Sequence, residues 1–404
     1  MNRSKKIVYT LLFSLIVFWG VSFFKFYAIK SEVGFIERGD GIIYKDDERH
    51  QYFGMHDIKG KKYYFDPNTG YVSEGFKKVG SKTFYFNKNG KVNTGLKKIG
   101  KDTYYFNKDG SIIQNEISTI YVNGKEQKSG FDKDGKMYRS TSIDYNGVRL
   151  SFDQDGVLQY DTKYMKKQIQ KIIGAYDGEV SVYFKDLSTR KDISINDRTF
   201  YPCCMIKLPA LASVHQALEQ GKIQYAPNQA DIEKMIIVSD NTAYNNLMKE
   251  IGDGNGIQGL FLTNQMALSL GMKDTALHHG LKPGENFFTD GGDNVSSAKD
   301  SGIFFEALYD NKVVTPERSQ EMLQLLKRTE SPAHINLGFP PTIPFAHKTG
   351  DIDDKYFHDG GIVYLPNRNY ILVIYTKKTT DHVGLMSEIS KFIYDYQSVF
   401  AKKY

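Results

Sequence analysis

The chain has 404 residues, which at about 150 residues per domain predicts two to three domains. Charged residues make up 25% and hydrophobic residues 40%, so neither a wholly disordered chain nor a polytopic membrane protein fits. The two cysteines, Cys203 and Cys204, are adjacent, and no Cys/His cluster has the spacing of a zinc site. This composition excludes a disulfide framework and a structural metal, and we expect neither a metal nor another cofactor.

The chain begins with an apolar segment. Residues 7–24 carry no charge, follow three basic residues and precede Lys25. A run of 18 residues can cross a hydrocarbon core, and basic residues in front of it keep the amino end in the cytoplasm. We expect 1–6 to be a cytoplasmic tail and 7–24 a single transmembrane signal-anchor, with the rest outside the membrane. A cleaved signal peptide ending near Gly20-Val21-Ser22 is the alternative.

The second segment, 40–160, repeats with a period of 20 residues. The stretch Gly60-Lys61-Lys62-Tyr63-Tyr64-Phe65 recurs at 80–86 and again at 100–106. Each unit combines a short aromatic strand, an Asn/Asp-Lys-Asn/Asp-Gly turn and a second strand, which predicts a β-hairpin. A single hairpin cannot bury its own face, so the repeats are predicted to stack into a β-hairpin solenoid.

These units resemble the glucan- and choline-binding type of cell-wall-binding repeat found on Gram-positive surface proteins and clostridial toxins. The resemblance implies binding to peptidoglycan or another cell-wall polymer. Phe76 and Leu96 stand where that family usually has Trp, the best ring for a choline cage, which argues against choline.

The repeats are also basic. Residues 51–110 contain 12 Lys and 5 Asp or Glu, which indicates either a solvated face or a docking face for an anionic wall polymer. Nucleic acid is not expected, because the compartment is wrong. The missing disulfide framework fits a bacterial surface, and we expect a Gram-positive-type cell membrane with the C-terminal part extracytoplasmic.

The third segment, 161–404, is long enough to bury a substantial core. A helix pattern opens it at 165–173, residues 205–335 are mainly helical, and an amphipathic helix around 385–393 closes it. Strand patterns occur near its start and its end, at 180–184, 192–195, 361–365 and 370–377. This order predicts an α+β fold, in which helices cover an antiparallel sheet and an all-helical subdomain is inserted mid-chain.

A cysteine begins the strongest helix pattern in this segment. The helix starts at Cys204 and runs through Leu218, and Lys207 lies one turn later on the same face. The positive end of the helix dipole and the charge of Lys207 both lower a thiol pKa, and the thiolate is the reactive species. Taken alone, a small buried cysteine beside a surface lysine is the simpler interpretation.

Two further motifs follow, Ser239-Asp240-Asn241 and then Lys348-Thr349-Gly350 just before the last strands. The order S-x-x-K, S-D-N, K-T-G is that of class A β-lactamases and penicillin-binding proteins. Residues 161–404 resemble this family along nearly their whole length, with Cys204 in place of the nucleophilic serine. The resemblance implies a β-lactamase-like fold and a covalent acyl-transfer reaction.

The resemblance also implies roles for the motif residues. Cys204 would attack an acyl carbonyl and form a thioester, Lys207 would hold the thiolate or accept its proton, and Ser239 would pass a proton to the leaving nitrogen. Lys348 would supply positive potential. Asn241, Thr349, Gly350 and Asp351 would bind substrate, with the backbone N–H groups of Cys204 and Asp351 forming the oxyanion hole. Asp240 and His347 are expected to be structural.

These assignments predict a membrane-anchored, wall-associated acyl-transfer enzyme that acts on peptidoglycan stem peptides, D-Ala-D-Ala-like peptides or β-lactams. An inactive protein that binds wall fragments or β-lactams is one alternative, and a true class A-like β-lactamase is the other. Residues 271–300 lack a clear Glu-x-x-Leu-Asn motif, since Glu285 is followed by Asn286-Phe287-Phe288-Thr289, so efficient β-lactam turnover is not expected. Cys203 is either a small buried residue or the partner of Cys204 in a vicinal disulfide.

Overall fold

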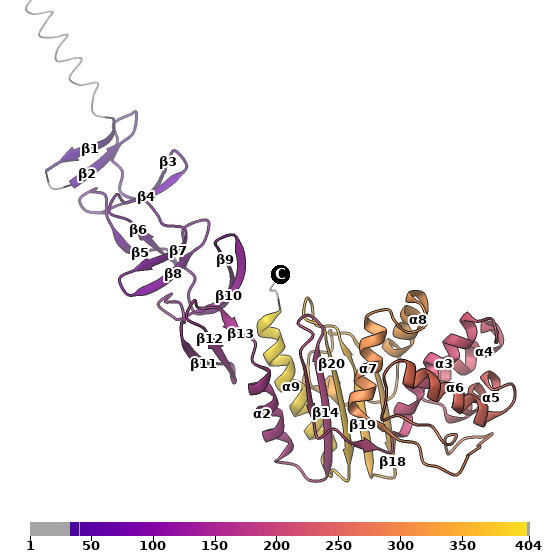
Figure 1. The fold of residues 1–404 in the computed structure, drawn as a ribbon. Helices are drawn as coiled ribbons and strands as arrows, with labels where there is room; N and C mark the ends of the chain where they lie inside the picture. Colours follow the sequence, from indigo (N-terminus) through magenta and orange to yellow (C-terminus); the bar gives the residue numbers. More distant parts are fainter. Residues whose placement is uncertain (1–32, 40, 402–404) are drawn as a thin grey trace, which may run out of the picture. The chain divides into compact units, whose positions relative to one another are not determined.

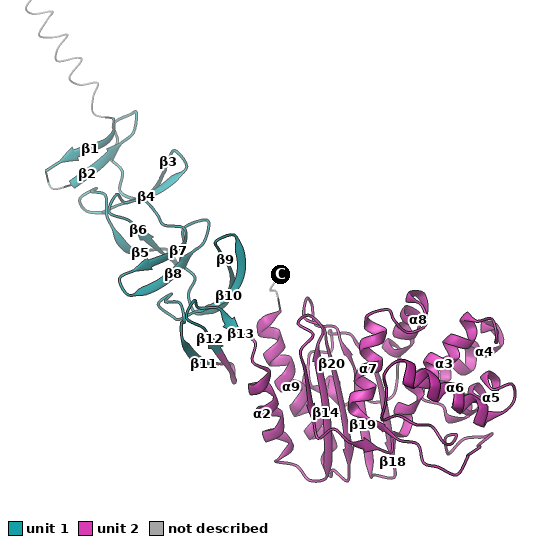
Figure 2. Ribbon diagram, viewed as in Figure 1, with its two compact units in different colours: residues 1–143, 151–159 teal, residues 144–150, 160–404 magenta. Residues whose placement is uncertain are grey.

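A computed structural model describes residues 33–39 and 41–401, which divide into two units (Figures 1 and 2). The first extends to residue 143 and includes 151–159, and the second consists of 144–150 and the residues from 160 onward. The expected transmembrane segment, 7–24, lies outside the described residues. Within the described part of the chain, no helix has the length and apolar character needed to cross a bilayer.

The first unit consists of antiparallel two-stranded hairpins, as predicted. They are β1–β2 (Gly34–Arg38, Gly41–Lys45), β3–β4 (Gly54–Ile58, Lys61–Phe65), β5–β6 (Gly75–Val79, Lys82–Phe86), β7–β8 (Gly95–Ile99, Asp102–Phe106) and β9–β10 (Glu116–Val122, Lys125–Phe131). A further hairpin, β11–β12 (Thr141–Tyr145, Val148–Phe152), with the short β13 (Leu158–Gln159) paired to β12, is divided between the units, because its residues 144–150 belong to the second.

The tight turn of each hairpin is not the predicted one. In β5–β6, Val79 pairs with Lys82, so the turn is Gly80-Ser81, with Gly80 at φ 61°. The Asn-rich turn follows the second strand instead, where the Asn87 side chain accepts hydrogen bonds from backbone N–H groups two and four residues further on. A glycine in the left-handed region lets a two-residue turn match the twist of its strands, and this decides the pairing.

Neighbouring hairpins are joined at the predicted period. The backbone N–H of Val92 donates to the carbonyl of Lys62 at 2.9 Å, and that of Ile112 donates to the carbonyl of Thr83 at 2.8 Å. The phenylalanines that end three successive second strands are buried: Phe65, Phe86 and Phe106. Each hairpin therefore relies on its neighbours to cover its aromatic face.

The second unit is built on a five-stranded antiparallel sheet with the order β15-β14-β20-β19-β18. Its strands are β14 (Glu179–Asp186), β15 (Asp192–Ile195), β18 (Phe345–Ile352), β19 (Tyr356–Val363) and β20 (Tyr370–Lys377). Residues 370–376 of the central strand are all buried, which explains why 370–375 are apolar or aromatic without a break. Lys348-Thr349-Gly350 lies inside β18 rather than before the strands, and β19 begins earlier than the predicted strand at 361–365.

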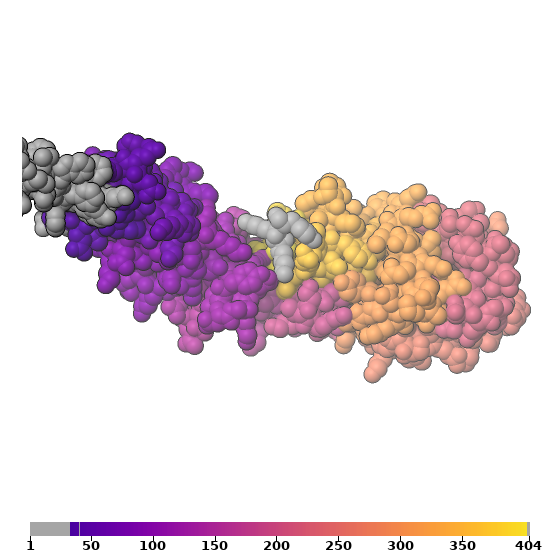
Figure 3. Space-filling model, turned by 90° about the horizontal axis from the view of Figure 1, so that it is seen from above, coloured from indigo at the N-terminus to yellow at the C-terminus, as the bar shows by residue number. Residues whose placement is uncertain are grey.

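Helices cover both faces of this sheet (Figure 1). Helices α2 (Thr162–Ile173) and α9 (His382–Phe400) pack together on one face, and α7 (Ala298–Tyr309) lies on the other. Asp161 begins α2, because its carboxylate accepts a hydrogen bond from the N–H of Tyr164 at 2.9 Å. The short helix η2 (Ile335–Gly338) packs against α9, and Figure 3 shows the orange and yellow parts of the chain side by side on the surface.

The helical subdomain is inserted between β15 and β18, as predicted. The short strands β16 (Thr199–Phe200) and β17 (Ser296–Ser297) pair with each other. Between them in the chain lie η1 (Cys203–Ile206), α3 (Lys207–Glu219), α4 (Tyr225–Ile237), α5 (Asn241–Ile251) and α6 (Gly256–Ser269), and α8 (Pro316–Lys327) follows α7. Helix α3 is buried on almost every side, which is why its sequence is apolar without a polar stripe.

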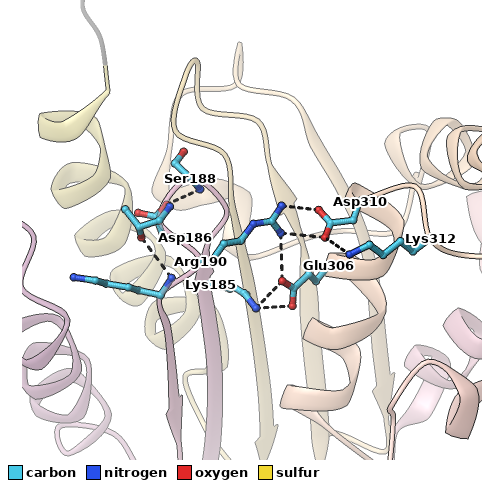
Figure 4. Close-up of polar contacts among 9 residues, drawn as sticks. Lys185, Asp186, Ser188, Arg190, Glu306, Asp310 and Lys312 are labelled. Carbon is cyan, nitrogen blue, oxygen red and sulfur yellow. Dashed lines mark hydrogen bonds and ion pairs between the residues drawn. The ribbon is translucent and has the colours of Figure 1, made fainter. Parts of the chain in front are cut away.

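Ion pairs hold β14 and the turn after it against α7 (Figure 4). The ammonium of Lys185 contacts the carboxylate of Glu306 at 2.6 Å. Arg190 contacts Glu306 at 3.3 Å and Asp310 at 2.7 Å, and Lys312 reaches Asp310 at 3.1 Å. Because these charges bridge separate elements in a network, they fix the sheet on its helix better than isolated surface pairs would.

Candidate active site

Cys204 lies in the 3-10 turn η1, directly before α3. The N–H of Met205 donates to the carbonyl of Pro202 at 3.0 Å, so the chain turns tightly and the α-helix begins only at Lys207, three residues later than predicted. Cys203 is buried and has a left-handed φ of 51°. A left-handed residue other than glycine costs roughly 1–2 kcal/mol, and such strain collects at functional sites.

Lys207 is completely buried, so the surface-lysine interpretation is wrong. Its Nζ lies 3.3 Å from Sγ of Cys204 and 3.2 Å from Oγ of Ser239. It also donates to Oδ1 of Asn241 at 2.7 Å and to the backbone carbonyl of Ser239 at 2.5 Å. One ammonium group therefore brings together residues from η1 and from the loop between α4 and α5, and the first residue of α5.

Ser239, like Cys203, is strained, with φ 57°. The next residue, Asp240, caps α5 by accepting a hydrogen bond from the N–H of Ala243 at 2.7 Å, which is the structural role expected of it. The cap fixes the loop so that the Ser239 hydroxyl lies between two lysines: its Oγ also accepts a hydrogen bond from Nζ of Lys348 at 2.8 Å.

Strand β18 approaches the cysteine turn very closely at Gly350. A Cβ atom at this position would lie 2.8 Å from the backbone N of Cys204 and 3.0 Å from Cβ of Cys203. Only glycine fits at this distance, because the backbone atoms opposite cannot move aside. The N–H of Cys204 therefore lies beside the strand that also carries Asp351, the other predicted oxyanion-hole residue.

A cavity of about 460 Å³ opens at this place. It is lined by Cys204, Ser239, Thr349, Gly350 and Asp351, together with Val238, Ser331, Pro332, His334, Phe357 and His358. Lys207, Asn241 and Lys348 do not line the cavity, but each of them contacts Cys204 or Ser239, which do. The structure thus brings the predicted site residues together at one cavity, while their catalytic roles stay predictions.

Six lining residues were missed by the sequence analysis. Ser331, Pro332 and His334 belong to a loop without any motif, and no spacing in the sequence marks it. The loop is held by Asp359, whose Oδ2 accepts hydrogen bonds from the N–H groups of His334 and Ile335 at 2.8 and 2.9 Å. Burial raises the pKa of Asp359 to about 7, although these two hydrogen bonds oppose the shift.

The charges around Cys204 favour its thiolate. Burial by itself would raise the pKa of the thiol, but the positive charges of Lys207 and Lys348 and the hydrogen bond from Ser239 outweigh it, so the pKa lies below its usual value. Burial lowers the pKa of Lys207, against the opposing effect of Cys204. Burial also lowers the pKa of Lys348, to about 8.

Cys203 has a different environment from its neighbour. Burial, and then the nearby Cys204, raise the pKa of its thiol. Its Sγ faces the carbonyl of Tyr201 at 3.8 Å, whereas Sγ of Cys204 faces Oδ1 of Asn241 at 3.7 Å. Both cysteines are free thiols. Of the two interpretations of Cys203, the structure shows the small buried residue.

Two other residues considered in the sequence, His347 and Glu285, do not line the cavity. His347 stacks on Phe345 with ring centres 4.7 Å apart, and burial, followed by the charge of Lys348, lowers its pKa to about 4. It is a packed residue, as expected. Glu285 is exposed, and its described contacts are made by its backbone, with Thr242 and Asn245. Among the described residues that line the cavity, Asp351 is the only carboxylate.

Solved structures with a similar fold are penicillin-binding proteins and β-lactamases. PBP-A is 22% identical, with 59% of this chain and 97% of that chain covered and a TM-score of 0.52. An acyl-enzyme complex of a PBP-A variant with penicillin G is 22% identical, with 58% and 96% covered and a TM-score of 0.51. A β-lactamase from Sphaerobacter thermophilus is 19% identical, with 59% and 99% covered and a TM-score of 0.51. At these identities the likeness shows the fold alone.

Family models identify both parts of the chain. Residues 164–229 and 226–397 match the model described as the β-lactamase enzyme family, and 74–92 and 94–112 match a putative cell wall binding repeat. Because the first match spans more than half of the chain, this protein belongs to the β-lactamase enzyme family. Both resemblances seen in the sequence are thereby confirmed. A comparison with curated proteins gives no match.

Proposed function

We propose that this protein is a membrane-anchored, wall-associated acyl-transfer enzyme that uses Cys204 as its nucleophile on peptidoglycan stem peptides or β-lactams. The observation that carries the proposal is the placement of the Lys207 ammonium within 3.3 Å of Sγ of Cys204, at a cavity that Ser239 also lines. An inactive binding protein would be expected to have lost Lys207, Ser239 or Lys348, and this chain keeps all three, with both lysines in contact with Ser239.

Acylation would begin with the Cys204 thiolate. Its sulfur attacks the carbonyl carbon of a D-Ala-D-Ala-like amide or a β-lactam ring, and the oxyanion accepts hydrogen bonds from the N–H groups of Cys204 and Asp351. The C–N bond then breaks and its electron pair goes to nitrogen. Ser239 gives its hydroxyl proton to that nitrogen and is reprotonated by an adjacent lysine ammonium, which leaves a thioester and a neutral lysine.

Acyl transfer would complete the cycle. An amine or water attacks the thioester carbonyl, its proton passes through Ser239 to the neutral lysine, and the thiolate leaves as the C–S bond breaks. Hydrolysis needs a base that orients water, and Glu285 is exposed and does not line the cavity. Transfer to an amine is therefore favoured over rapid hydrolysis, which argues against a true β-lactamase.

Substrate recognition would rest on the other motif residues. Lys348 is buried behind the cavity, where its positive charge attracts a substrate carboxylate toward Thr349 and the edge of β18 at Gly350. Asn241 would hold the substrate amide, and its Oδ1 is oriented by the hydrogen bond from Lys207. Both interactions match a peptide that ends in a carboxylate.

The proposed location rests on two features of the sequence, the uncharged run 7–24 and the repeats that follow it. The uncharged run 7–24 behind basic residues supports a single anchor in the cell membrane, with everything after it extracytoplasmic. The wall-binding repeats and their excess of lysine support contact with peptidoglycan or an anionic wall polymer. The enzyme would then be held between its membrane and its substrate.

Intact-protein mass spectrometry tests the proposal. The full-length protein is incubated with penicillin G or with a peptide ending in D-Ala-D-Ala, beside Cys204→Ala and the matched control Cys203→Ala. We expect an adduct on the wild type and on Cys203→Ala, and none on Cys204→Ala. Fast product release without an adduct would indicate a β-lactamase or peptidase with rapid turnover. An unchanged protein and unchanged substrates would indicate an inactive binding protein.

A further inference from the structure

A deeply buried histidine, His358, connects the sheet to the turn that carries Cys204. It lies on β19, where it pairs with Gly350 of β18 on one side and with Tyr375 of β20 on the other. Only 3% of its surface is exposed, although it is one of the residues that line the cavity. None of the chemical steps proposed above uses this side chain.

Both ring nitrogens of His358 have a hydrogen-bond partner. Nε2 lies 2.8 Å from the backbone carbonyl oxygen of Tyr201, and Nδ1 lies 3.3 Å from the backbone N of Thr376. A carbonyl only accepts a hydrogen bond and a backbone N–H only donates one, so the proton of the neutral ring belongs on Nε2. Burial lowers the pKa of His358 to about 4, against the opposing effect of the Tyr201 carbonyl, so the ring is neutral at pH 7.

The ring of His358 is also fixed by packing. It stacks on the ring of Tyr375, with the ring centres 4.0 Å apart and the planes at 13°, and the ring of Phe200 lies edge-on at 5.9 Å. The hydroxyl of Tyr375 is in turn joined to that of Ser301 on α7 at 2.8 Å. The N–H of His358 is therefore a donor with one fixed direction.

The Tyr201 carbonyl lies at the start of the cysteine turn. The next carbonyl along the chain, that of Pro202, accepts the hydrogen bond from Met205 at 3.0 Å that begins η1. Cys203 between them is left-handed, and such a conformation persists only where its surroundings hold it. His358 supplies part of that support, because its N–H fixes the carbonyl directly before this turn.

The same histidine lies beside both halves of the predicted oxyanion hole. One N–H of the hole belongs to Cys204, in the turn that His358 holds through Tyr201. The other belongs to Asp351, the neighbour of Gly350, and Gly350 is the residue of β18 that pairs with His358. Donors of an oxyanion hole act only within about 3 Å of the oxyanion, so a small shift of either segment weakens them.

We propose that His358 is a positioning residue, whose N–H sets the separation of the two oxyanion-hole N–H groups by holding the cysteine turn against β19. This inference rests on the proposed acyl transfer, in which the oxyanion forms. Loss of the His358 donor is therefore expected to slow acylation and to leave the affinity for unreacted substrate as it is, because the oxyanion exists only along the reaction path.

Three substitutions in the full-length protein separate the donor from the ring. The amide of His358→Gln reaches the place of Nε2 and donates to Tyr201, the amide of His358→Asn is one methylene too short, and His358→Leu has no donor. We expect penicillin G to acylate His358→Asn and His358→Leu about tenfold more slowly than the wild type, and His358→Gln at nearly the wild-type rate. Circular dichroism melts show which variants are folded at the assay temperature.

The matched control is His215→Leu. His215 on α3 is likewise buried, and burial likewise lowers its pKa to about 4. Its ring nitrogens, however, have no hydrogen-bond partner in the described part of the chain. His215→Leu should therefore be acylated at the wild-type rate.

The carbonyl stretch of the adduct reports on the oxyanion hole itself. Infrared difference spectra between adducts of ordinary penicillin G and of penicillin G with an isotope-labelled β-lactam carbonyl isolate this band. Hydrogen bonds to a carbonyl lower its stretching frequency, so the band should lie at a higher frequency in His358→Asn and His358→Leu than in the wild type, His358→Gln and His215→Leu. A general loss of stability would not move the band in this pattern.

A measurement on the wild type complements the variants. Correlation NMR of the histidine ring nitrogens at pH 7, assigned with the spectrum of His358→Gln, should show His358 neutral with its proton on Nε2. A proton on Nδ1 would overturn the inference, because the ring then has no donor for Tyr201. The inference is also overturned if His358→Leu keeps the wild-type rate and band, or if His358→Gln is impaired as much as His358→Leu. A wild type that forms no adduct would instead overturn the proposed function, and this inference with it.

Discussion

The Nζ of Lys348 donates a hydrogen bond to Oγ of Ser239 at 2.8 Å, although the two residues lie 109 positions apart in the chain. Lys348 comes from β18 and Ser239 from the loop between α4 and α5, so this bond joins the sheet to the helical subdomain beside the cavity that Ser239 lines. Because Lys207 also contacts this hydroxyl, the charge of either lysine would affect the proton transfer that we propose for Ser239.

The first prediction concerns the pH dependence of acylation. The pKa of Lys348 is lowered to about 8, so its charge is present below pH 8 and lost above it. We expect acylation by penicillin G, which carries a carboxylate, to slow as the pH rises through 8. In Lys348→Gln the acylation rate should be about tenfold lower and should no longer fall near pH 8. Stopped-flow or quenched mass spectrometry follows adduct formation.

A substrate without the carboxylate provides the control for that experiment. Penicillin G methyl ester should acylate the wild type without the fall at pH 8. If the ester and the acid show the same fall, Lys348 acts on proton transfer through Ser239 rather than on carboxylate binding.

The second prediction concerns which cysteine is reactive. Cys204 has a lowered thiol pKa, and Cys203 is buried with a raised one. Iodoacetamide at pH 7 should therefore label Cys204 first. Lys207→Met removes the nearest positive charge, so we expect the pKa of Cys204 to rise and its labelling to slow about tenfold. Peptide mass spectrometry locates the label.

The lysine control is Lys222→Met, which removes a partly exposed charge beyond the end of α3. Its labelling rate should match the wild type. Faster labelling of Cys203 than of Cys204 in the wild type would contradict the assignment of Cys204 as the nucleophile.

The third prediction tests the contact between β18 and η1. In Gly350→Ala the new Cβ would lie 2.8 Å from the backbone N of Cys204, so the strand or the turn must shift. We expect a loss of about 1–3 kcal/mol in the free energy of unfolding, together with a loss of penicillin acylation because the oxyanion hole is displaced. Gly174→Ala is the control, since its Cβ would lie 3.4 Å from the nearest atom. Unchanged acylation in Gly350→Ala would show that the edge of β18 takes no part in the oxyanion hole.

The fold was largely predictable because its signals are local. The period of 20 residues and the placement of strand and helix patterns depend on neighbouring residues, and both resemblances are confirmed. The hairpin turn was assigned wrongly because Gly80-Ser81 and the Asn-rich turn after β6 both carry turn residues. Only the pairing of Val79 with Lys82 decides between them.

The site was predictable where motifs mark it and hidden where distant contacts build it. Three motifs in order place Cys204, Ser239 and Lys348 at one cavity. The loop that carries His334 reaches the cavity through hydrogen bonds to Asp359, 25 residues further on, and no local pattern reveals this. The motif marks Gly350, but the reason for a glycine there, the close approach of β18 to the cysteine turn, is visible only in the structure.

The last prediction replaces Cys204 with serine. The contacts of Lys207 with Ser239 and Asn241, and of Lys348 with Ser239, do not involve the sulfur, so the environment of the new hydroxyl is retained. We expect Cys204→Ser to form an acyl-enzyme with penicillin G that lasts about tenfold longer than the wild-type thioester in the presence of an amine, because an oxygen ester is less prone to attack by amines. Time-resolved intact-protein mass spectrometry, with and without added glycine amide, measures the lifetime, and Cys203→Ser serves as the control.

Hydrolysis of the serine adduct should stay slow as well. Glu285 is exposed, and the carboxylate among the described residues that line the cavity belongs to Asp351, on the strand edge that we propose binds the substrate. A water molecule near the ester therefore has no carboxylate placed to orient it for attack, which an amine nucleophile does not need. Rapid hydrolysis of penicillin G by Cys204→Ser would contradict this account. It would mean that Asp351 or a lysine positions water after all, and that the wild-type chain differs from a β-lactamase by one substitution.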